Sequence, residues 1–167
     1  DVFVTNLRTS ALTRLGLDPE RLRARNPRLV YCSITGYGLE GPDADKAGFD
    51  IAGFWARGGV AGLLTPAGGE PPFQRGGMGD HSTGLAAAGA VAAALFARER
   101  TGEGQLVSTS LFRQGVYTVG FDLAGRPLRE PAELRGQDRR PLSRIGAGDV
   151  GGHTIAVVGR DRRRLLV

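Results

Sequence analysis

Residues 28–35, RLVYCSIT, form an apolar run of strand-forming side chains with almost no alternation between polar and apolar positions. A half-buried strand alternates, because its side chains point in turn to the core and to water, so this run predicts a strand covered on both faces. Strands of that kind occur in parallel sheets, whose connections are helices packed on the sheet. The run therefore limits the chain to a layered α/β fold.

The sequence around this run predicts the helices and further strands of such a layer. Asp18 followed by proline and glutamate is a strong helix start, and Asn26 followed by proline ends that helix. The expected elements in chain order are a strand at 1–6, a helix from an N-cap at Ser10 to Gly16, a helix at 19–25, the strand at 28–35, a helical stretch within 49–59, a long helix at 81–100, a strand at 105–110, a helix at 111–124 and a hairpin at 147–159. Strand, helix and buried strand in this order indicate a Rossmann-like, doubly wound domain.

Composition narrows the function classes. The net charge of +5 comes almost wholly from arginine, since Lys46 is the only lysine, and such a charge can attract nucleic acid or phosphate-bearing ligands. No aromatic side chains are interleaved with the arginine-rich stretches near the end, which disfavours nucleic acid. The longest small apolar run, 84–97, is too short to span a bilayer. We expect a cytoplasmic protein that does not insert into membranes.

The residues with reactive side chains are few. Cys32, the one cysteine, rules out an internal disulfide, fits a reducing compartment and is expected to be a packed thiol. With His81 and His153 as the two histidines, no metal site is expected. Tyr37, Phe54 and Trp55 could line a pocket for a ligand, but their more ordinary role is core packing.

Asp80 stands among glycines in GGMGDHSTG, residues 76–84. One interpretation is structural: the carboxylate caps the helix that follows. The other is chemical, because a helix N-terminus favours negative charge, while Gly76, Gly77 and Gly79 leave room for a substrate and offer backbone donors to an oxyanion. An accessible carboxylate in such a place can act as a nucleophile. The position alone leaves both interpretations open.

Five stretches of the chain, in order, carry a resemblance to a known family: DVFVTNLRTSALTRLGL, NPRLVYCSITGYGLEGP, AGFDIAGFWARGG, GDHSTGLAAAGAVAAALFARERTGEGQLV and STSLF. The chain resembles the class III coenzyme A transferases, which include formyl-CoA and carnitine-CoA transferases and are similar to the α-methylacyl-CoA racemases. The resemblance is good over residues 1–112 and looser beyond.

This resemblance implies an architecture. Complete members have a large Rossmann-like domain and a smaller domain, in two chains that form an interlocked homodimer. Residues 1–124 would belong to the large domain, and residues 125–167 would be a linker and the start of the small one. The chain would then be a fragment without the amino-terminal segment that supplies much of the CoA pocket, and we expect the 167 residues alone to be poorly active.

The resemblance also implies a reaction in which Asp80 is the nucleophile. The aspartate attacks an acyl-CoA thioester, which gives a mixed anhydride and CoA thiolate, and the thiolate then forms an aspartyl-CoA thioester. An acceptor carboxylate takes the CoA through a second anhydride. Coenzyme A enters as substrate, no permanently bound cofactor is implied, and the site must exclude water because water hydrolyses these intermediates.

Further positions follow from the same resemblance. Asn6, Leu7, Arg14 and Leu15 are implied to line the adenine and phosphate pocket, with Arg14 as a charge-assisted phosphate partner or, equally, a solvated helix arginine. Lys46 lies in a loop, where it could meet phosphate or simply face solvent.

Phe49 bears on the choice between two related chemistries. The related racemases carry histidine in the matching Gly-His-Asp triplet, whereas this chain has phenylalanine, which cannot exchange protons. CoA transfer is therefore favoured over racemisation. Asp50 either orients groups in the substrate pocket or caps the helix after Gly48, and His81 is expected to be structural.

Overall fold

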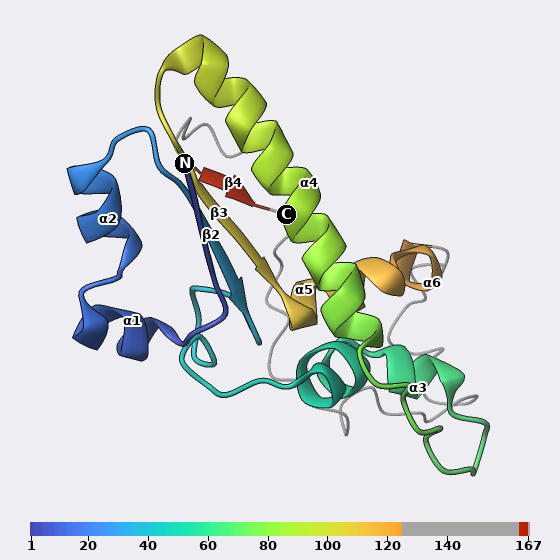
Figure 1. The fold of residues 1–167 in the computed structure, drawn as a ribbon. Coiled ribbons are helices and arrows are strands. Elements are labelled where there is room, and N and C mark those ends of the chain that lie inside the picture. The colour runs from blue at the N-terminus through green and yellow to red at the C-terminus, as the bar shows by residue number, and fades with distance from the viewer. Residues whose placement is uncertain (125–163, 167) are drawn as a thin grey trace, which may run out of the picture.

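The structure is a computed structural model that describes residues 1–124 and 164–166. Its centre is a parallel sheet with strands in the order β1-β2-β3-β4 (Figure 1). The strands are β1 (Val2–Thr5), β2 (Val30–Thr35), β3 (Leu106–Ser110) and β4 (Arg164–Leu166). The expected α/β class with a parallel sheet is confirmed, while the hairpin expected at 147–159 lies outside the described residues.

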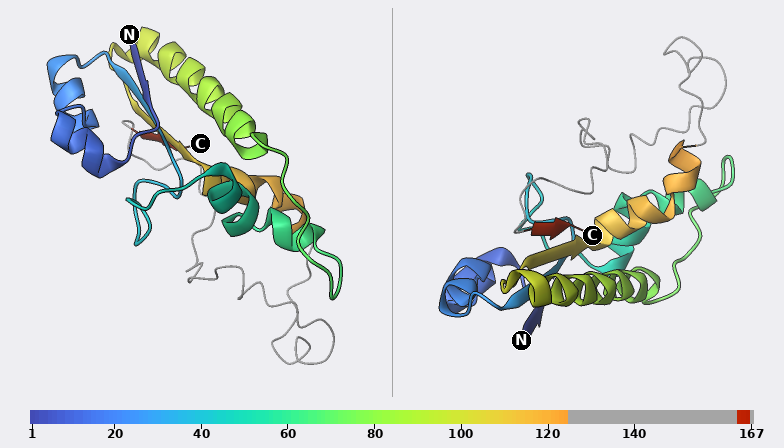
Figure 2. Two further views of the ribbon diagram at one scale, coloured as in Figure 1. Left: turned by 60° about the horizontal axis from the view of Figure 1, so that its bottom comes forward. Right: turned by 90° about the horizontal axis from the view of Figure 1, so that it is seen from above.

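Helices cover both faces of the sheet, as Figure 2 shows. The shorter helices α1 (Thr9–Leu15) and α2 (Pro19–Arg25) lie on one side, and the long helix α4 (Met78–Thr101) lies on the other. This two-sided cover is the physical reason for the unbroken apolar run in β2, all of whose first four residues are buried.

The two faces of β2 are packed differently. Val30 and Cys32 contact three alanines of α4, Ala87, Ala90 and Ala94, whose small side chains let the helix approach the sheet closely. On the opposite face the ring of Tyr31 lies 5.1 Å from that of Phe3, and its hydroxyl donates a hydrogen bond of 2.9 Å to the carbonyl of Leu17, between α1 and α2.

A second core lies beyond the carboxyl edge of the sheet. It is formed by the π-helical segment η1 (Ile51–Arg57) together with α3 (Val60–Leu64) and α5 (Leu111–Thr118). Phe54 and Trp55 are buried in it, and the Trp55 indole donates to the carbonyl of Pro72 at 3.2 Å. The helical stretch expected within 49–59 is thus present, and both aromatic residues serve core packing.

Three helix boundaries differ from the expectation. The helix α4 starts at Met78 rather than at residue 81, because Gly77 in the left-handed region (φ 81°) turns the chain into the helix. Asp80 is therefore not the N-cap but lies in the first turn. Similarly, Arg8 rather than Ser10 is the N-cap of α1, and the helix expected at 111–124 is divided at Val119 into α5 and α6 (Gly120–Ala124).

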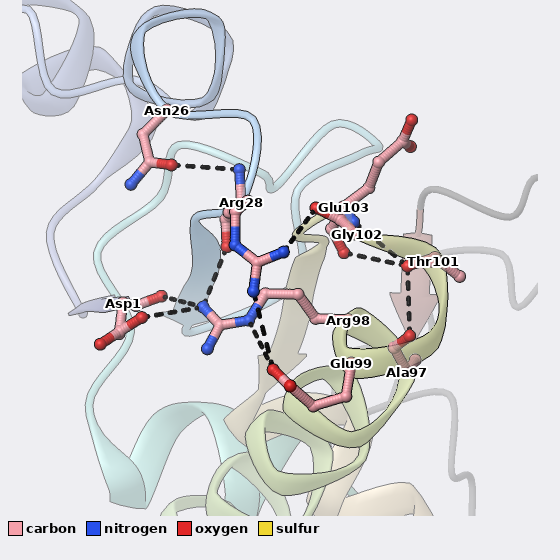
Figure 3. A network of polar contacts seen from close by, with 9 residues as sticks. All are labelled: Asp1, Asn26, Arg28, Ala97, Arg98, Glu99, Thr101, Gly102 and Glu103. Atoms are coloured by element: carbon pink, nitrogen blue, oxygen red, sulfur yellow. Dashed lines mark hydrogen bonds and ion pairs between the residues drawn. The ribbon is translucent and has the colours of Figure 1, made fainter.

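The amino-terminal end of the sheet is joined to the end of α4 by a polar network (Figure 3). The guanidinium of Arg98, almost fully buried, donates to the carbonyl of Arg28 at 3.1 Å and forms an ion pair of 3.1 Å with Asp1. Arg28 in turn donates to the carbonyl of Gly102 at 3.2 Å. These contacts fix one end of α4 to the start of β1 and β2, so the other end is held at the opposite, carboxyl edge of the sheet.

Candidate active site

A cavity of about 480 Å³ lies at the carboxyl ends of β1 and β2, beside the first two turns of α4. Ligands of open α/β sheets bind at this edge, because the loops that follow the strands converge there. The lining residues are Asn6, Leu7 and Arg8 after β1, Ile34, Thr35 and Gly36 from the end of β2, Ala44, Lys46, Ala47, Gly48, Phe49 and Asp50 from the next loop, Asp80, Thr83 and Gly84 from α4, and Leu111.

Asp80 is exposed in the first turn of α4 and lines this cavity. Within the described residues no hydrogen bond or ion pair engages its carboxylate. The partial positive charge of the helix N-terminus favours a negative group at this place. The geometry therefore leaves the Asp80 oxygens available to a molecule in the cavity.

The capping role, which was one of the two interpretations of Asp80, is filled by Asp50. Both carboxylate oxygens of Asp50 accept from the backbone N–H of Gly79, at 3.0 and 3.2 Å. A side chain at position 79 would collide with Asp50 and with the ring of Phe54, so glycine is required for this contact. Of the two roles weighed for Asp50, capping is the one seen, but the capped helix is α4 and not the segment directly after Gly48.

The loop of residues 36–50 caps a second helix in the same way. A carboxylate oxygen of Asp45 accepts from the backbone N–H of Ser10, in the first turn of α1, at 3.0 Å. The hydrogen bonds from Ser10 hold the pKa of Asp45 below its ordinary value. One loop thus provides carboxylates to α1 and α4, which lie on opposite faces of the sheet, and the cavity lies between them.

Two cationic side chains stand on the cavity wall, Arg8 and Lys46. The ammonium group of Lys46 pairs with Asp43, and the hydrogen bond it donates holds the pKa of that carboxyl below its ordinary value. Arg57 also binds Asp43, at 3.0 Å, which ties the loop to η1. Cations at the rim of a cavity suit a phosphate-bearing ligand.

The structure brings together about half of the site residues expected from the sequence. Those on the cavity wall are Asn6, Leu7, Lys46, Phe49, Asp50 and Asp80. Arg14 and Leu15 lie exposed near the end of α1, outside the lining. Gly76, Gly77 and Gly79 are not part of the wall either: Gly77 is the N-cap of α4, and the backbone N–H of Gly79 donates to Asp50.

Several polar residues of the cavity wall were not expected from the sequence, notably Arg8, Thr35 and Thr83. The position of Thr83 on the cavity wall could have been predicted, because it lies three residues after the candidate nucleophile Asp80 and residues three apart share one face of a helix. Arg8 directly follows the expected Leu7. Thr35 ends the buried strand, where the carboxyl edge of a parallel sheet could have indicated a site.

Other candidates lie away from this cavity. Cys32 is fully buried in β2 and burial raises the pKa of its thiol, which confirms a packed cysteine. Tyr37 lines a separate, smaller cavity of about 150 Å³. Within residues 1–124 and 164–166 no cluster of three His, Cys, Asp or Glu side chains is placed to hold a metal ion. No helix in that part of the chain has the length and hydropathy needed to cross a membrane.

The fold and the site define a class of protein, and comparison with known sequences identifies it. The sequence profile of CoA-transferase family III matches residues 1–150, so the chain belongs to this family. It is 46% identical over 121 residues to the cinnamoyl-CoA:phenyllactate CoA-transferase of Clostridium sporogenes, a match that covers 72% of this chain and 29% of that protein.

Two further comparisons agree with this family assignment. The chain is 41% identical to the (R)-2-hydroxy-4-methylpentanoate CoA-transferase of Clostridioides difficile, over 72% of this chain and 30% of that one. The crystal structure of a CAIB/BAIF family protein from Brucella suis matches with a TM-score of 0.68 at 35% identity, over 78% of this chain and 35% of the other. The chain thus spans less than a third of the length of these two CoA-transferases.

Proposed function

We propose that the complete protein transfers coenzyme A from an acyl-CoA donor to a carboxylic acid acceptor, with Asp80 as the nucleophile. The observation that carries this proposal is an exposed carboxylate without a partner among the described residues, in the first turn of a helix and on the wall of a cavity at the carboxyl edge of the sheet. Membership of CoA-transferase family III and the CoA-transferase names of the relatives support it.

The proposed reaction conserves the energy of the thioester through four exchanges. An oxygen of Asp80 attacks the thioester carbonyl carbon and the C–S bond breaks, which gives a mixed anhydride and CoA thiolate. The thiolate attacks the aspartyl carbonyl and releases the donor acid, leaving an aspartyl-CoA thioester. The acceptor carboxylate displaces the thiolate to form a second anhydride. The thiolate then attacks the acceptor's acyl carbonyl, which yields the new acyl-CoA and regenerates Asp80.

Contacts around Asp80 are consistent with this role. Because Asp50 takes the capping position at Gly79, the Asp80 carboxylate is not consumed by the backbone of its own helix. Asn6, Leu7, Arg8 and Lys46 stand on the same wall and are the proposed contacts of coenzyme A, whose phosphates the two cations would bind. Arg14 and Leu15, which follow on α1, remain candidates for the part of CoA that extends beyond the cavity.

Trapping experiments test the role of Asp80 in the full-length gene product. After incubation with acyl-CoA, hydroxylamine should convert Asp80 to its hydroxamate and borohydride should reduce it, both detectable by peptide mass spectrometry. Asp80→Asn should abolish transfer, while Asp122→Asn, an exposed acid in the first turn of α6, serves as the matched control. An Asp80→Asn or Asp80→Ala variant with full transfer activity would refute the assignment.

Two alternative functions, racemisation and nucleic-acid binding, would each give a different experimental result. A racemase would exchange the α-proton of a 2-methylacyl-CoA with solvent deuterium without any acceptor, but Phe49, which lines the cavity and is 77% exposed, offers no proton. A basic nucleic-acid-binding module would retain DNA at low salt and release it as salt rises. Either result without acyl transfer would replace the proposal.

We further propose that the complete protein is an interlocked homodimer in the cytoplasm. Several large apolar side chains of the described chain are exposed, including Phe73 (89%), Phe121 (88%) and Leu85 (76%), and a second chain or the rest of the protein would cover them. The unpaired Cys32 supports a reducing compartment.

A further inference from the structure

Thr83 is a buried polar residue next to the proposed nucleophile. It lies three residues after Asp80 on α4 and lines the same cavity, yet only 1% of its surface is exposed. Its hydroxyl oxygen has no hydrogen-bond partner in the described part of the chain. Because buried polar groups in folded proteins are nearly always paired, an unpaired hydroxyl on a residue that lines a ligand cavity calls for an explanation.

Threonines in other helices, or directly after one, make a hydrogen bond that Thr83 does not make. Four of them, in the described residues, donate their hydroxyl proton to the carbonyl four residues earlier: Thr13 to Thr9 (3.1 Å), Thr65 to Ala61 (2.6 Å), Thr101 to Ala97 (3.1 Å) and Thr118 to Gln114 (2.9 Å). The corresponding carbonyl for Thr83 is that of Gly79, and no hydrogen bond joins it to the Thr83 hydroxyl. The Ser82 hydroxyl lies 3.1 Å from this carbonyl but makes its shorter contact, 2.9 Å, with the carbonyl of Met78. The Thr83 hydroxyl is thus left free to act as a donor.

Its place in the cavity separates Thr83 from the remaining unpaired groups. The other buried side-chain atoms without a hydrogen-bond partner, within the residues that the structure describes, are Arg23 Nε, Gln74 Nε2, Arg98 Nε and Thr109 Oγ1. None of these four residues lines the cavity that holds Asp80. Thr83 alone among them combines burial, an unpaired donor and a position beside the reacting carboxylate.

We propose that the Thr83 hydroxyl donates a hydrogen bond to the acyl carbonyl oxygen of the substrate, which becomes negative when Asp80 attacks the carbonyl carbon. This inference rests on the proposed function. Residues three apart on a helix have Cβ atoms about 5–6 Å apart, so a carbonyl group fits between an attacking carboxylate and a donor on the next turn. The proton stays on Thr83, and the hydrogen bond strengthens as charge develops on the oxygen and is relieved when the C–S bond breaks.

Removing the hydroxyl without changing the side-chain shape tests this role. Thr83→Val in the full-length gene product should lower kcat by about 100-fold, the lower end of the range for loss of an oxyanion donor, with little change in KM. Its midpoint of thermal unfolding should equal or exceed that of the wild type, because an unpaired buried hydroxyl does not stabilise the fold. Thr118→Val, at a hydroxyl that binds its own helix, is the matched control and should leave kcat unchanged.

Two variants with smaller side chains at position 83 give a second, independent measurement of the hydroxyl's contribution to kcat. Thr83→Ser keeps the donor and Thr83→Ala lacks it, so their kcat ratio should again be about 100. A ratio near one, or a Thr83→Val variant with wild-type kcat, overturns the inference. If Asp80→Asn is inactive in the same series, only the role of Thr83 fails. If the wild type forms no acyl–Asp80 adduct at all, the proposed function itself fails.

Discussion

The Asp80 carboxylate is not bound to the backbone of its own helix, because another residue, Asp50, caps that helix. In α2 the cap is local, since Asp18 accepts from the N–H of Arg21 at 3.0 Å. In α4 the N-cap is Gly77, which has no side chain to offer, and the first-turn N–H of Gly79 is satisfied by Asp50 from the preceding loop. Two carboxylates therefore stand at the start of α4, one bound to the backbone and one exposed to the cavity.

Asp50→Ala should lower both stability and activity. Loss of the cap is expected to reduce the free energy of unfolding by about 1 kcal/mol, in line with other N-cap deletions, and to lower kcat because the first turn that carries Asp80 loses its anchor. Asp50→Asn keeps an acceptor oxygen and should restore most of the stability. Urea unfolding and initial transfer rates measure the two effects. An Asp50→Ala variant as stable as Asp50→Asn would contradict this account of the Asp50–Gly79 contact.

Tyr31 should make the protein sensitive to alkaline pH. Burial, with a smaller contribution from the negative charges of Asp18 and Glu20, raises the pKa of Tyr31 from 10 to about 12. Between these values the unfolded chain loses the phenolic proton while the folded chain retains it, so the free energy of unfolding falls by up to about 1.4 kcal/mol per pH unit. Below pH 10 the effect is absent.

Tyr31→Phe isolates this effect from the titration of other groups. The difference in the free energy of unfolding between wild type and variant should be constant up to about pH 10 and shrink above it, since phenylalanine has no proton to lose. The variant also loses the hydrogen bond to Leu17, which lowers its stability at neutral pH. Parallel denaturation curves from pH 8 to 11.5 give the measurement, and a difference that stays constant throughout would show the prediction to be wrong.

Local capping signals were readable from the sequence, but distant ones were not. The Asp18 cap and the end of the first helix at Gly16 follow from rules that involve neighbouring residues. The cap at Gly79 depends on a residue 29 positions earlier, which no local pattern encodes. Capping by Asp80 was therefore one of the two interpretations of this position, since Asp80 is the nearest suitable side chain.

At the scale of elements, the crossing of η1 and α5 depends on two glycines. A Cβ added at Gly115 would lie 2.6 Å from the carbonyl oxygen of Phe54 and 2.8 Å from the Cα of Gly58. The two backbones thus approach more closely than any side chain would allow. This contact sets the place of Leu111, which starts α5 and lines the candidate active site.

Gly115→Ala should therefore destabilise the protein, by about 1–3 kcal/mol, because the atoms that the new methyl group meets are backbone and cannot move aside cheaply. Gly89→Ala is the matched control: position 89 lies exposed in the middle of α4 with open space around it. That change should stabilise the helix by roughly 0.5–1 kcal/mol, since alanine loses less backbone entropy than glycine. Equal effects of the two substitutions in chemical denaturation would be incompatible with the crossing described.

Helices and strands with a strong local sequence pattern were predicted from the sequence, and those with a weak pattern were misplaced. The ends of the strands β1, β2 and β3 were predicted to within two residues, because β-branched runs bounded by glycine, proline or asparagine leave few alternatives. The start of α4 was misplaced because it consists of glycine and methionine, with neither a capping side chain nor an apolar period. The division at Val119 was not expected, although Gly120 follows it directly and glycine is common at helix ends; Val119 itself is buried in the second core.

At the scale of the whole molecule, the candidate active site is open on one side. Asp80, Phe49 and the loop around Lys46 are exposed in the described chain, although an acyl anhydride survives only where water is excluded. The chain corresponds to 29% of the length of its Clostridium sporogenes relative. The described residues alone would therefore leave the proposed anhydride exposed to water, and a covering segment or a second chain would be needed to exclude it.

The 167 residues expressed alone should consequently transfer little or no CoA. Where Asp80 reacts at all, water should reach the anhydride first, so that acyl-CoA is consumed without formation of the acceptor's CoA ester. Mass spectrometry of the CoA products, with the full-length gene product assayed beside the short chain, distinguishes hydrolysis from transfer. Asp80→Asn in the short chain should remove the hydrolysis. Transfer by the short chain at a rate close to that of the full-length product would mean that the described cavity already excludes water, and that no further covering segment is needed for the chemistry.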